Sequence, residues 1–299
     1  MMAQFDPELR AKVQALGRAL NPDVLSQSQA LYAPLQTTVT PDEAIIVRDA
    51  RYGTHERHRL DILRRTAITP LPALVFVHGG GFVGGDKNRP GSPFYDNVAI
   101  WAARSGLVGV NMTYRLAPDH PWPAGAEDVA AAVDWLRRNA NAHGVDPERI
   151  WVAGQSAGAA HVAAAFAQGL MAEAAGAILI SGVYDLTLAD PRTLSIPYYG
   201  ADPSMFEARS SAKLLAAKDT PVLIATAEFD PRHFQKQSLA LANAIFDARG
   251  ALPRFYTMSG HNHITGILHL GLPGDHLGLE ILDFIKTGQD KPRSEGRGQ

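Results

Sequence analysis

A serine between two glycines is the first feature of this sequence that could carry out chemistry. Residues 154–158 read Gly-Gln-Ser-Ala-Gly, a Gly-x-Ser-x-Gly pattern that places a serine on a sharp, strained strand-to-helix turn. A Cβ at either flanking glycine would collide with the neighbouring helix and strand. Residues 149–153 are strand-like and residues 159–170 are an alanine-rich helical stretch, which is the context the pattern requires. Ser156 is therefore our candidate nucleophile; the alternative is a Gly/Ser-rich turn without chemistry.

Three consecutive glycines follow a second apolar segment. Residues 73–78 run directly into Gly79, Gly80 and Gly81. Glycines leave backbone N–H groups open to a ligand, and acyl transfer needs such donors because negative charge builds on the carbonyl oxygen. We expect these N–H groups, together with that of Ala157 at the start of the helix after the serine, to form an oxyanion hole.

The same glycines have an alternative interpretation as a nucleotide-binding loop. Gly79, Gly81 and Gly84 fit Gly-x-Gly-x-x-Gly, but the dinucleotide fingerprint needs a helix to open at once. Pro90 and the residues after it prevent that helix, and no Gly-Lys-Ser/Thr is present for a phosphate loop. The chain has no cysteine, which excludes a thiolate nucleophile and cysteine-ligated metals. We therefore expect no cofactor and no metal.

The elements that must position these residues follow from the apolar pattern. Short apolar runs alternate with helical stretches, and continuous apolar runs are typical of parallel strands buried on both faces. We predict an α/β fold with a doubly wound, mostly parallel, eight-stranded sheet whose first two strands form an antiparallel edge. The predicted strands are residues 44–47, 59–63, 73–78, 107–112, 149–153, 177–181, 222–226 and 254–258. The predicted helices are residues 98–104, 126–139, 157–170, 234–249 and 276–286.

Two segments outside this alternation are predicted to form a helical cap. Residues 1–42 are amphipathic and helical in pattern, with no evident strand. Residues 186–214 hold several prolines and short helical pieces, and we interpret them as an insertion over the sheet that packs against the N-terminal helices. Residues 43–287 then form the catalytic domain, and residues 288–299 a polar tail.

Composition excludes several classes of function. Twenty-eight Lys and Arg residues against 30 Asp and Glu residues give a net charge of −2, with no basic block, so nucleic-acid binding is unsupported. The N-terminus carries no basic and apolar signal pattern, and no apolar run is long enough to span a bilayer. We expect a soluble cytoplasmic protein that does not bind membranes.

Three motifs in one order resemble the hormone-sensitive-lipase-like esterases of the α/β-hydrolase superfamily. They are His-Gly-Gly-Gly-Phe at residues 78–82, a segment from Tyr-Arg-Leu-Ala-Pro to Ala-Glu-Asp at residues 114–128, and the serine motif at residues 154–158. The resemblance covers about residues 44–286. Gln155 stands where the family usually has Asp, and residues 260–264 read Gly-His-Asn-His-Ile where His-Gly-Phe is common. Both departures look more like the branch of kynurenine formamidases and small bacterial carboxylesterases.

The serine needs a base, and the base needs an orienting carboxylate. The resemblance implies the chain order serine, acid, histidine, and Asp230, at the end of a predicted strand, is similar to the family's acid. Glu228, expected to point the same way, and Asp185, after the preceding strand, are its rivals. For the base, His261 and His263 both follow the last predicted strand, and the related branch favours His263.

A metal site at His261, His263 and His269 lacks a positioned carboxylate or cysteine, and we disfavour it. The resemblance implies a serine carboxylesterase that hydrolyses small, short-acyl esters through an acyl-enzyme. The alternatives are an arylformamidase or amidase of the kynurenine formamidase type and a non-catalytic receptor for a small ligand. The expected partner is a small-molecule ester, and a homodimer remains open.

Overall fold

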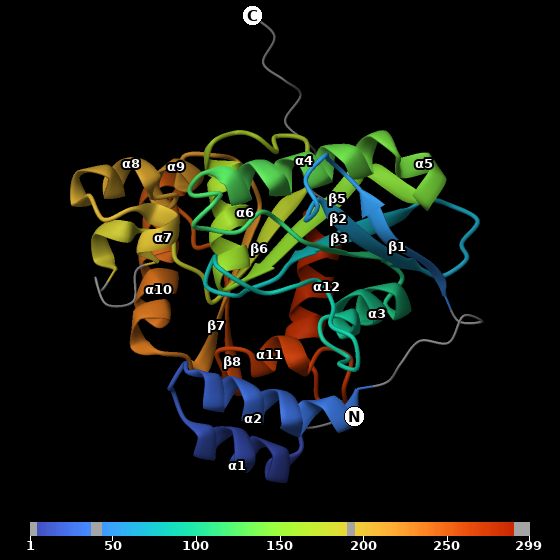
Figure 1. Cartoon of the computed structure of the whole chain (residues 1–299), viewed down its shortest axis with the longest axis horizontal. Helices are drawn as coiled ribbons and strands as arrows, with labels where there is room; N and C mark the ends of the chain where they lie inside the picture. Colours follow the sequence, from blue (N-terminus) through green and yellow to red (C-terminus); the bar gives the residue numbers. More distant parts are fainter. Residues whose placement is uncertain (1–4, 37–43, 190–194, 290–299) are drawn as a thin grey trace, which may run out of the picture.

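The computed structural model describes residues 5–36, 44–189 and 195–289 of the chain. At its centre is an eight-stranded sheet in the order β1-β2-β4-β3-β5-β6-β7-β8. Strand β2 is antiparallel to its neighbours β1 and β4, whereas the remaining neighbouring pairs are parallel. The predicted mostly parallel, eight-stranded sheet with an antiparallel edge is thus confirmed (Figure 1).

Each predicted strand and helix is present, with differences at the boundaries. The strands are β1 (Ile45–Arg51), β2 (Arg59–Arg64), β3 (Leu71–Val77), β4 (Val108–Met112), β5 (Val145–Gln155), β6 (Gly176–Ile180), β7 (Val222–Phe229) and β8 (Arg254–Asn262). The main helices are α1 (Pro7–Leu16), α2 (Pro22–Tyr32), α3 (Asp96–Arg104), α4 (Ala124–Arg138), α6 (Ala157–Ala167), α10 (Arg232–Arg249) and α12 (His276–Gln289). The shorter helices are η1 (Ala33–Leu35), α5 (Ala140–His143), η2 (Leu186–Leu188), α7 (Ile196–Tyr199), η3 (Pro203–Met205), α8 (Phe206–Arg209), α9 (Ala212–Ala216) and α11 (Thr265–Leu268). The sequence pattern missed α5 and α11, which are single turns too short to show a helical period.

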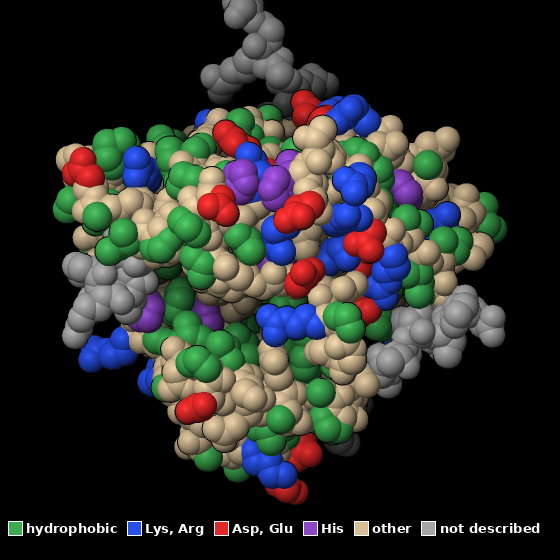
Figure 2. Space-filling model, in the orientation of Figure 1, with side chains coloured by type: hydrophobic (Ala, Val, Ile, Leu, Met, Phe, Trp, Pro, Cys, Tyr) green, Lys and Arg blue, Asp and Glu red, His purple; other side chains and the backbone are tan. Residues whose placement is uncertain are grey.

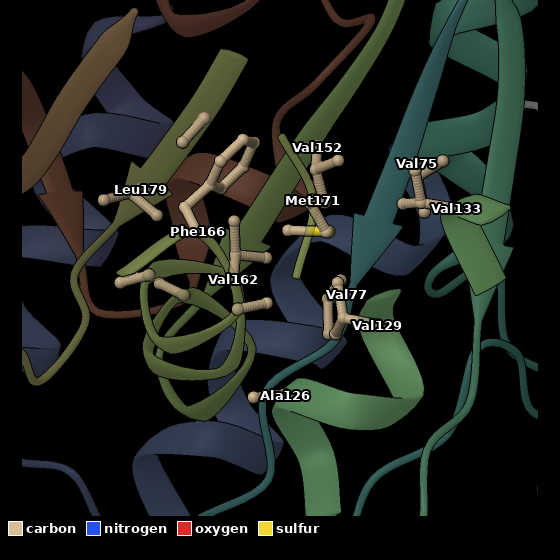
Figure 3. Packing of buried hydrophobic residues seen from close by; sticks show 14 of the residues in the cluster. Val75, Val77, Ala126, Val129, Val133, Val152, Val162, Phe166, Met171 and Leu179 are labelled. Carbon is tan, nitrogen blue, oxygen red and sulfur yellow. The ribbon is translucent and has the colours of Figure 1, made fainter. Parts of the chain in front are cut away.

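Both faces of the sheet are buried, as the continuous apolar runs predict. Alternate residues of β3 enter different clusters: Val75 and Val77 pack with α4 and α6, whereas Leu74 and Phe76 pack with α3 and α12. Figure 3 shows the first cluster, where labelled side chains of β3, β5 and β6 meet those of α4 and α6. Helices packed on both faces hold the strands, and therefore the strand ends, in fixed positions.

The N-terminal helices begin at well-capped positions. Asp6 accepts a hydrogen bond from the Glu8 N–H, and Asn21 accepts one from the Val24 N–H; each cap is followed by proline at the first helical position. Residues of α1 and α2 pack with α11 and with the segment before α3, and Figure 1 shows both helices beside the β8 end of the sheet. Residues 1–4 and 37–42 of the predicted cap segment lie outside the described residues.

The predicted insertion at residues 186–214 contains η2, α7, η3, α8 and the start of α9. Residues 190–194 lie outside the described residues, as do residues 290–299 of the predicted tail. The buried rings of Tyr198 and Tyr199 pack against Phe82 of the glycine loop and against Ala157 and Ala160 of α6. The insertion therefore contacts the two segments on which the sequence places the oxyanion donors.

The candidate residues leave the sheet at one edge. Strands β3, β5, β6, β7 and β8 are neighbours in the sheet, and each is parallel to the next. The carboxyl ends of parallel strands meet at one side of a sheet. Gly79 is the second residue after β3, and Ser156, Asp230 and His263 directly follow β5, β7 and β8, respectively.

Candidate active site

Ser156 stands on a strained turn between β5 and α6. Its backbone has φ +56° and ψ −120°, a conformation that non-glycine residues rarely adopt. A Cβ at Gly154 would lie 2.4 Å from the Gly158 carbonyl oxygen, and one at Gly158 would lie 2.0 Å from the Val77 carbonyl oxygen. Both glycines are therefore required by close backbone contacts, for the physical reason that the sequence pattern suggested.

His263 lies between Ser156 and Asp230. Its Nε2 is 2.9 Å from Ser156 Oγ, and its Nδ1 is 2.7 Å from Asp230 Oδ1. A carboxylate at Nδ1 selects the tautomer that carries its proton there, which leaves Nε2 free to accept the serine proton. The ring also stacks on Phe234 with centroids 4.1 Å apart, and the His263 carbonyl accepts a hydrogen bond of 2.9 Å from Gln155 Nε2. The imidazole is thus held by its two ring nitrogens, one face and its backbone.

Asp230 is completely buried, and its second carboxylate oxygen, Oδ2, accepts three hydrogen bonds. Oδ2 accepts hydrogen bonds from Ser181 Oγ at 2.6 Å, Thr226 Oγ1 at 3.0 Å and the Ala227 N–H at 2.6 Å. Burial pushes the pKa of Asp230 up, but the bonds from His263, Ser181 and Ala227 outweigh burial and hold the pKa below its usual value. The structure therefore keeps this buried carboxyl group ionised.

The structure does not bring Glu228 or Asp185 to the serine. Glu228 Oε2 accepts hydrogen bonds from the Gly260 N–H at 2.7 Å and Ser259 Oγ at 3.0 Å, and Asp185 caps η2 through Thr187. The prediction that Glu228 points the same way as Asp230 is wrong because strand alternation ends at Phe229. The chain then turns, with the Asp230 N–H donating to the Ala227 carbonyl at 3.1 Å.

His261 faces away from the serine. Its ring stacks on Phe5 with centroids 4.7 Å apart, and its Nδ1 is 3.2 Å from Thr265 Oγ1. Burial lowers the pKa of His261 to about 3, so this imidazole is neutral. His269 packs beside it at 5.2 Å, whereas the His263 ring turns toward Ser156. Among the described residues, no group of three or more His, Asp or Glu side chains is arranged to hold a metal ion.

The glycine loop lies close to Ser156, since a Cβ at Gly79 would lie 3.2 Å from the Ser156 Cβ. Gly80 has φ +132°, and a Cβ there would lie 2.1 Å from the Gly84 carbonyl oxygen; Gly81 has φ +62°. His78 holds the start of the loop, because its Nδ1 lies 2.6 Å from the Gly79 carbonyl oxygen. Burial lowers the pKa of His78 to about 4, so its ring is neutral. Backbone of this kind can point its N–H groups at a ligand without side-chain obstruction.

One cavity of about 920 Å³ joins these groups. Gly79, Gly80, Gly81, Ser156, Ala157 and His263 all line it. Its other walls include residues of α2, of the insertion and of α10, and most of them are apolar. Figure 2 shows this recess between the N-terminal helices, at the bottom of the view, and the body of the molecule, with hydrophobic and histidine side chains inside it. Its size and apolar lining suit a small organic ligand.

Sequence reasoning gave no role to three residues that the structure places around the site. Ser181 and Thr226 donate to Asp230, and Gln155 donates to the carbonyl of His263. The positions of Ser181 and Thr226 are a usable signal, since each ends a predicted strand. Gln155 stands out in the sequence only as a departure from a family pattern.

Comparison with known proteins agrees with this architecture. The model of a family described by its alpha/beta hydrolase fold matches residues 74–263. The carboxylesterase NlhH of Mycobacterium tuberculosis is 41% identical over 132 residues, which are 43% of this chain and 38% of NlhH. The esterase LipQ of the same organism is 29% identical over 241 residues, which are 72% of this chain and 56% of LipQ.

A solved structure extends the fold comparison over nearly the whole chain. The hyperthermophilic esterase from Pyrobaculum calidifontis superimposes with a TM-score of 0.70 over 95% of this chain and 98% of its own, at 23% identity. Within the described ranges, no helix has the length and apolar character needed to cross a membrane. The family match covers well over half of the sequence, and the sheet order and serine turn accompany it: the chain belongs to the family of the α/β-hydrolase fold.

Proposed function

We propose that this protein is a serine carboxylesterase that hydrolyses small, short-acyl esters through an acyl-enzyme. The observation that carries the proposal is the hydrogen-bonded series Ser156–His263–Asp230, which opens into the cavity beside the glycine loop. The named carboxylesterase and esterase among its relatives support it. The alternative is an arylformamidase or amidase, which would turn over N-formylkynurenine faster than a butyrate ester.

In the first half of the reaction, Ser156 Oγ attacks the ester carbonyl carbon and its proton passes to His263 Nε2. The resulting imidazolium is stabilised by the Asp230 carboxylate, 2.7 Å away. Negative charge that develops on the carbonyl oxygen would be met by the N–H groups of Gly79, Gly80, Gly81 and Ala157. Collapse of this intermediate breaks the bond to the alcohol, which leaves with the proton from His263.

In the second half, water attacks the acyl-Ser156 carbonyl and gives its proton to His263. The tetrahedral intermediate collapses again, the acid leaves, and the proton returns to Ser156. We also propose that residues 1–42 and 186–214 act as the cap of a catalytic domain spanning residues 43–287. Residues of α2 and α7 support this proposal because they line the cavity on which Ser156 opens.

The test combines covalent labelling with kinetics. A fluorophosphonate should add to Ser156, as mapped by mass spectrometry, and p-nitrophenyl butyrate should give burst kinetics. Ser156→Ala should lose both, with kcat falling about 10³-fold or more. Ser92→Ala is the matched control, because Ser92 also lines the cavity but its Oγ accepts from the Phe94 N–H. Undiminished turnover by Ser156→Ala would refute the proposal, and faster turnover of N-formylkynurenine than of the butyrate ester would favour the amidase.

A further inference from the structure

The cavity beside Ser156 has one charged residue in its described lining. Of the described residues that line it, Arg89 is the one Lys, Arg, Asp or Glu residue, in a wall that is otherwise apolar, neutral polar or histidine. A guanidinium is ionised at all physiological pH values and presents a planar set of donors that matches a carboxylate. The charge on this wall is therefore a candidate for substrate recognition.

The backbone around Arg89 is firmly held. Lys87 and Asn88, the two preceding residues, both bind the buried carboxylate of Asp61, with Lys87 Nζ 2.9 Å from Oδ1 and Asn88 Nδ2 2.5 Å from Oδ2. The Ser92 N–H then donates to the Arg89 carbonyl at 3.0 Å across a Pro-Gly turn, and Gly91 has φ +76°, as the third residue of such a turn requires. Arg89 thus projects from a fixed loop.

The charge of Arg89 is not neutralised within the described part of the chain. Other cations of the same region have partners: Arg57 pairs with Asp86 at 3.8 Å, and Lys87 pairs with Asp49 and Asp61. No carboxylate of a described residue lies within 4.0 Å of the Arg89 guanidinium, and the side chain is exposed. An exposed, unpaired guanidinium can bind a ligand anion without first breaking an internal ion pair.

The field of Arg89 reaches the cavity wall. Burial raises the pKa of Tyr95, and the positive charge of Arg89 opposes that rise. Tyr95 lines the cavity, so the guanidinium lies within electrostatic range of it. Figure 2 shows Lys or Arg side chains along the rim of the recess.

We propose that Arg89 forms a carboxylate-binding subsite and that the preferred substrates are esters that carry a carboxylate away from the scissile bond. This inference rests on the proposed esterase function and names its substrate class. The ester enters with its carbonyl at Ser156 and its carboxylate on the Arg89 side of the cavity. The apolar walls between them contact the intervening carbon chain.

Matched ester pairs test the proposal. On the acyl side, monomethyl adipate is compared with methyl hexanoate; on the alcohol side, 4-acetoxybutanoate is compared with butyl acetate. Arg89→Gln should lower kcat/KM for the anionic member of at least one pair by about 10-fold or more, with the neutral member unchanged within about twofold. Arg89→Lys, which keeps the charge but loses the planar donor set, should give a smaller loss. Added salt should reduce the wild-type preference for the anion.

Arg65→Gln is the control, because Arg65 is exposed, lies outside the cavity and gives the same change of net charge. Equal effects of Arg89→Gln and Arg65→Gln on both pairs would overturn the proposed subsite. The esterase function would still be supported in that case, provided that neutral esters are turned over and Ser156 is labelled. Loss of neutral-ester hydrolysis and labelling in the wild-type protein would instead remove the proposed function, and this inference with it.

Discussion

Replacing Ser181 with alanine tests whether the hydrogen bonds to Asp230 keep that buried acid ionised. The Ser181 hydroxyl donates to Asp230 Oδ2 at 2.6 Å, beside the donors from Thr226 and Ala227. A hydrogen bond to a charged group contributes about 1.5–3 kcal/mol. Because this bond favours the ionised carboxylate, losing it should raise the pKa of Asp230.

The kinetic consequence depends on pH. Turnover by the proposed mechanism needs an ionised Asp230 with a neutral His263, and the acidic limb of the rate profile reports the pair rather than either residue. In Ser181→Ala, kcat/KM for p-nitrophenyl butyrate should change little at pH 8, where the carboxylate is still ionised. At lower pH it should fall earlier than in the wild type, and the acidic limb should move upward by up to about 1 unit.

The free energy of unfolding of Ser181→Ala should also fall, and the size of that fall should depend on pH. The pKa of Asp230 is lower in the folded chain than in the unfolded chain, so its ionisation stabilises the fold above the unfolded value of about 4, and this contribution is lost as pH falls through the folded pKa. Ser181→Ala should therefore reduce the free energy of unfolding by about 1.5–3 kcal/mol between pH 5 and 8, with a smaller reduction below about pH 4. Urea unfolding followed by tryptophan fluorescence measures both.

Ser181→Gly separates the hydroxyl from the backbone. Ser181 has φ +51°, which costs an alanine about 1–2 kcal/mol but costs glycine almost nothing. The glycine variant should show the same shift of the acidic limb as the alanine variant. The glycine variant should also be more stable than the alanine variant by up to about 1 kcal/mol. This is less than the backbone strain relieved, because glycine gives the unfolded chain more conformational freedom. Rate profiles of both variants that superimpose on the wild type would refute the reasoning.

Two further substitutions test the packing around the site. Gly158→Ala places a Cβ 2.0 Å from the Val77 carbonyl oxygen, so α6 must move away from β3. We expect the free energy of unfolding in urea to fall by about 3 kcal/mol or more and esterase activity to be lost. Gly84→Ala is the control: its added Cβ has its nearest neighbour at 3.8 Å, so its free energy of unfolding should stay within about 1 kcal/mol of the wild type. Tyr198→Phe removes the hydroxyl 3.1 Å from Nδ1 of the buried His161 and should cost about 1–3 kcal/mol; an unchanged urea midpoint would show that this bond does not hold the insertion in place.

The sequence predicts the inner strands of the sheet well because they are buried on both faces. An apolar run such as residues 177–181 has one plausible structure in this context, and β6 (Gly176–Ile180) forms there. Strand ends were less accurate, since β8 continues to Asn262, four residues beyond the predicted end. Hydrogen bonds from Gly260 and Ser259 to Glu228 of β7 hold that extension, and a long-range contact of this kind leaves no local pattern.

The choice between His261 and His263 illustrates the same limit. Both residues follow the predicted strand, and their spacing alone says only that they could face opposite ways. The structure distinguishes them through partners from distant segments: Phe5 covers His261, whereas Gln155 and Phe234 hold His263. The base could thus be proposed from the sequence by resemblance, but its position depends on contacts with residues more than 25 positions away.

The place of β6 in the sheet explains the position of Ser181. Strand β6 lies between β5, which ends at the serine turn, and β7, which ends at the acid. A residue just beyond the end of β6 is therefore near both: the Ile180 carbonyl accepts from the Ser156 N–H at 2.9 Å, and the next residue donates its hydroxyl to Asp230. Two adjacent residues, Ile180 and Ser181, thus hold the backbone of Ser156 and the carboxylate of Asp230. A change of backbone conformation here should disturb both groups at once, which is why the glycine and alanine variants of Ser181 are more informative together than either is alone.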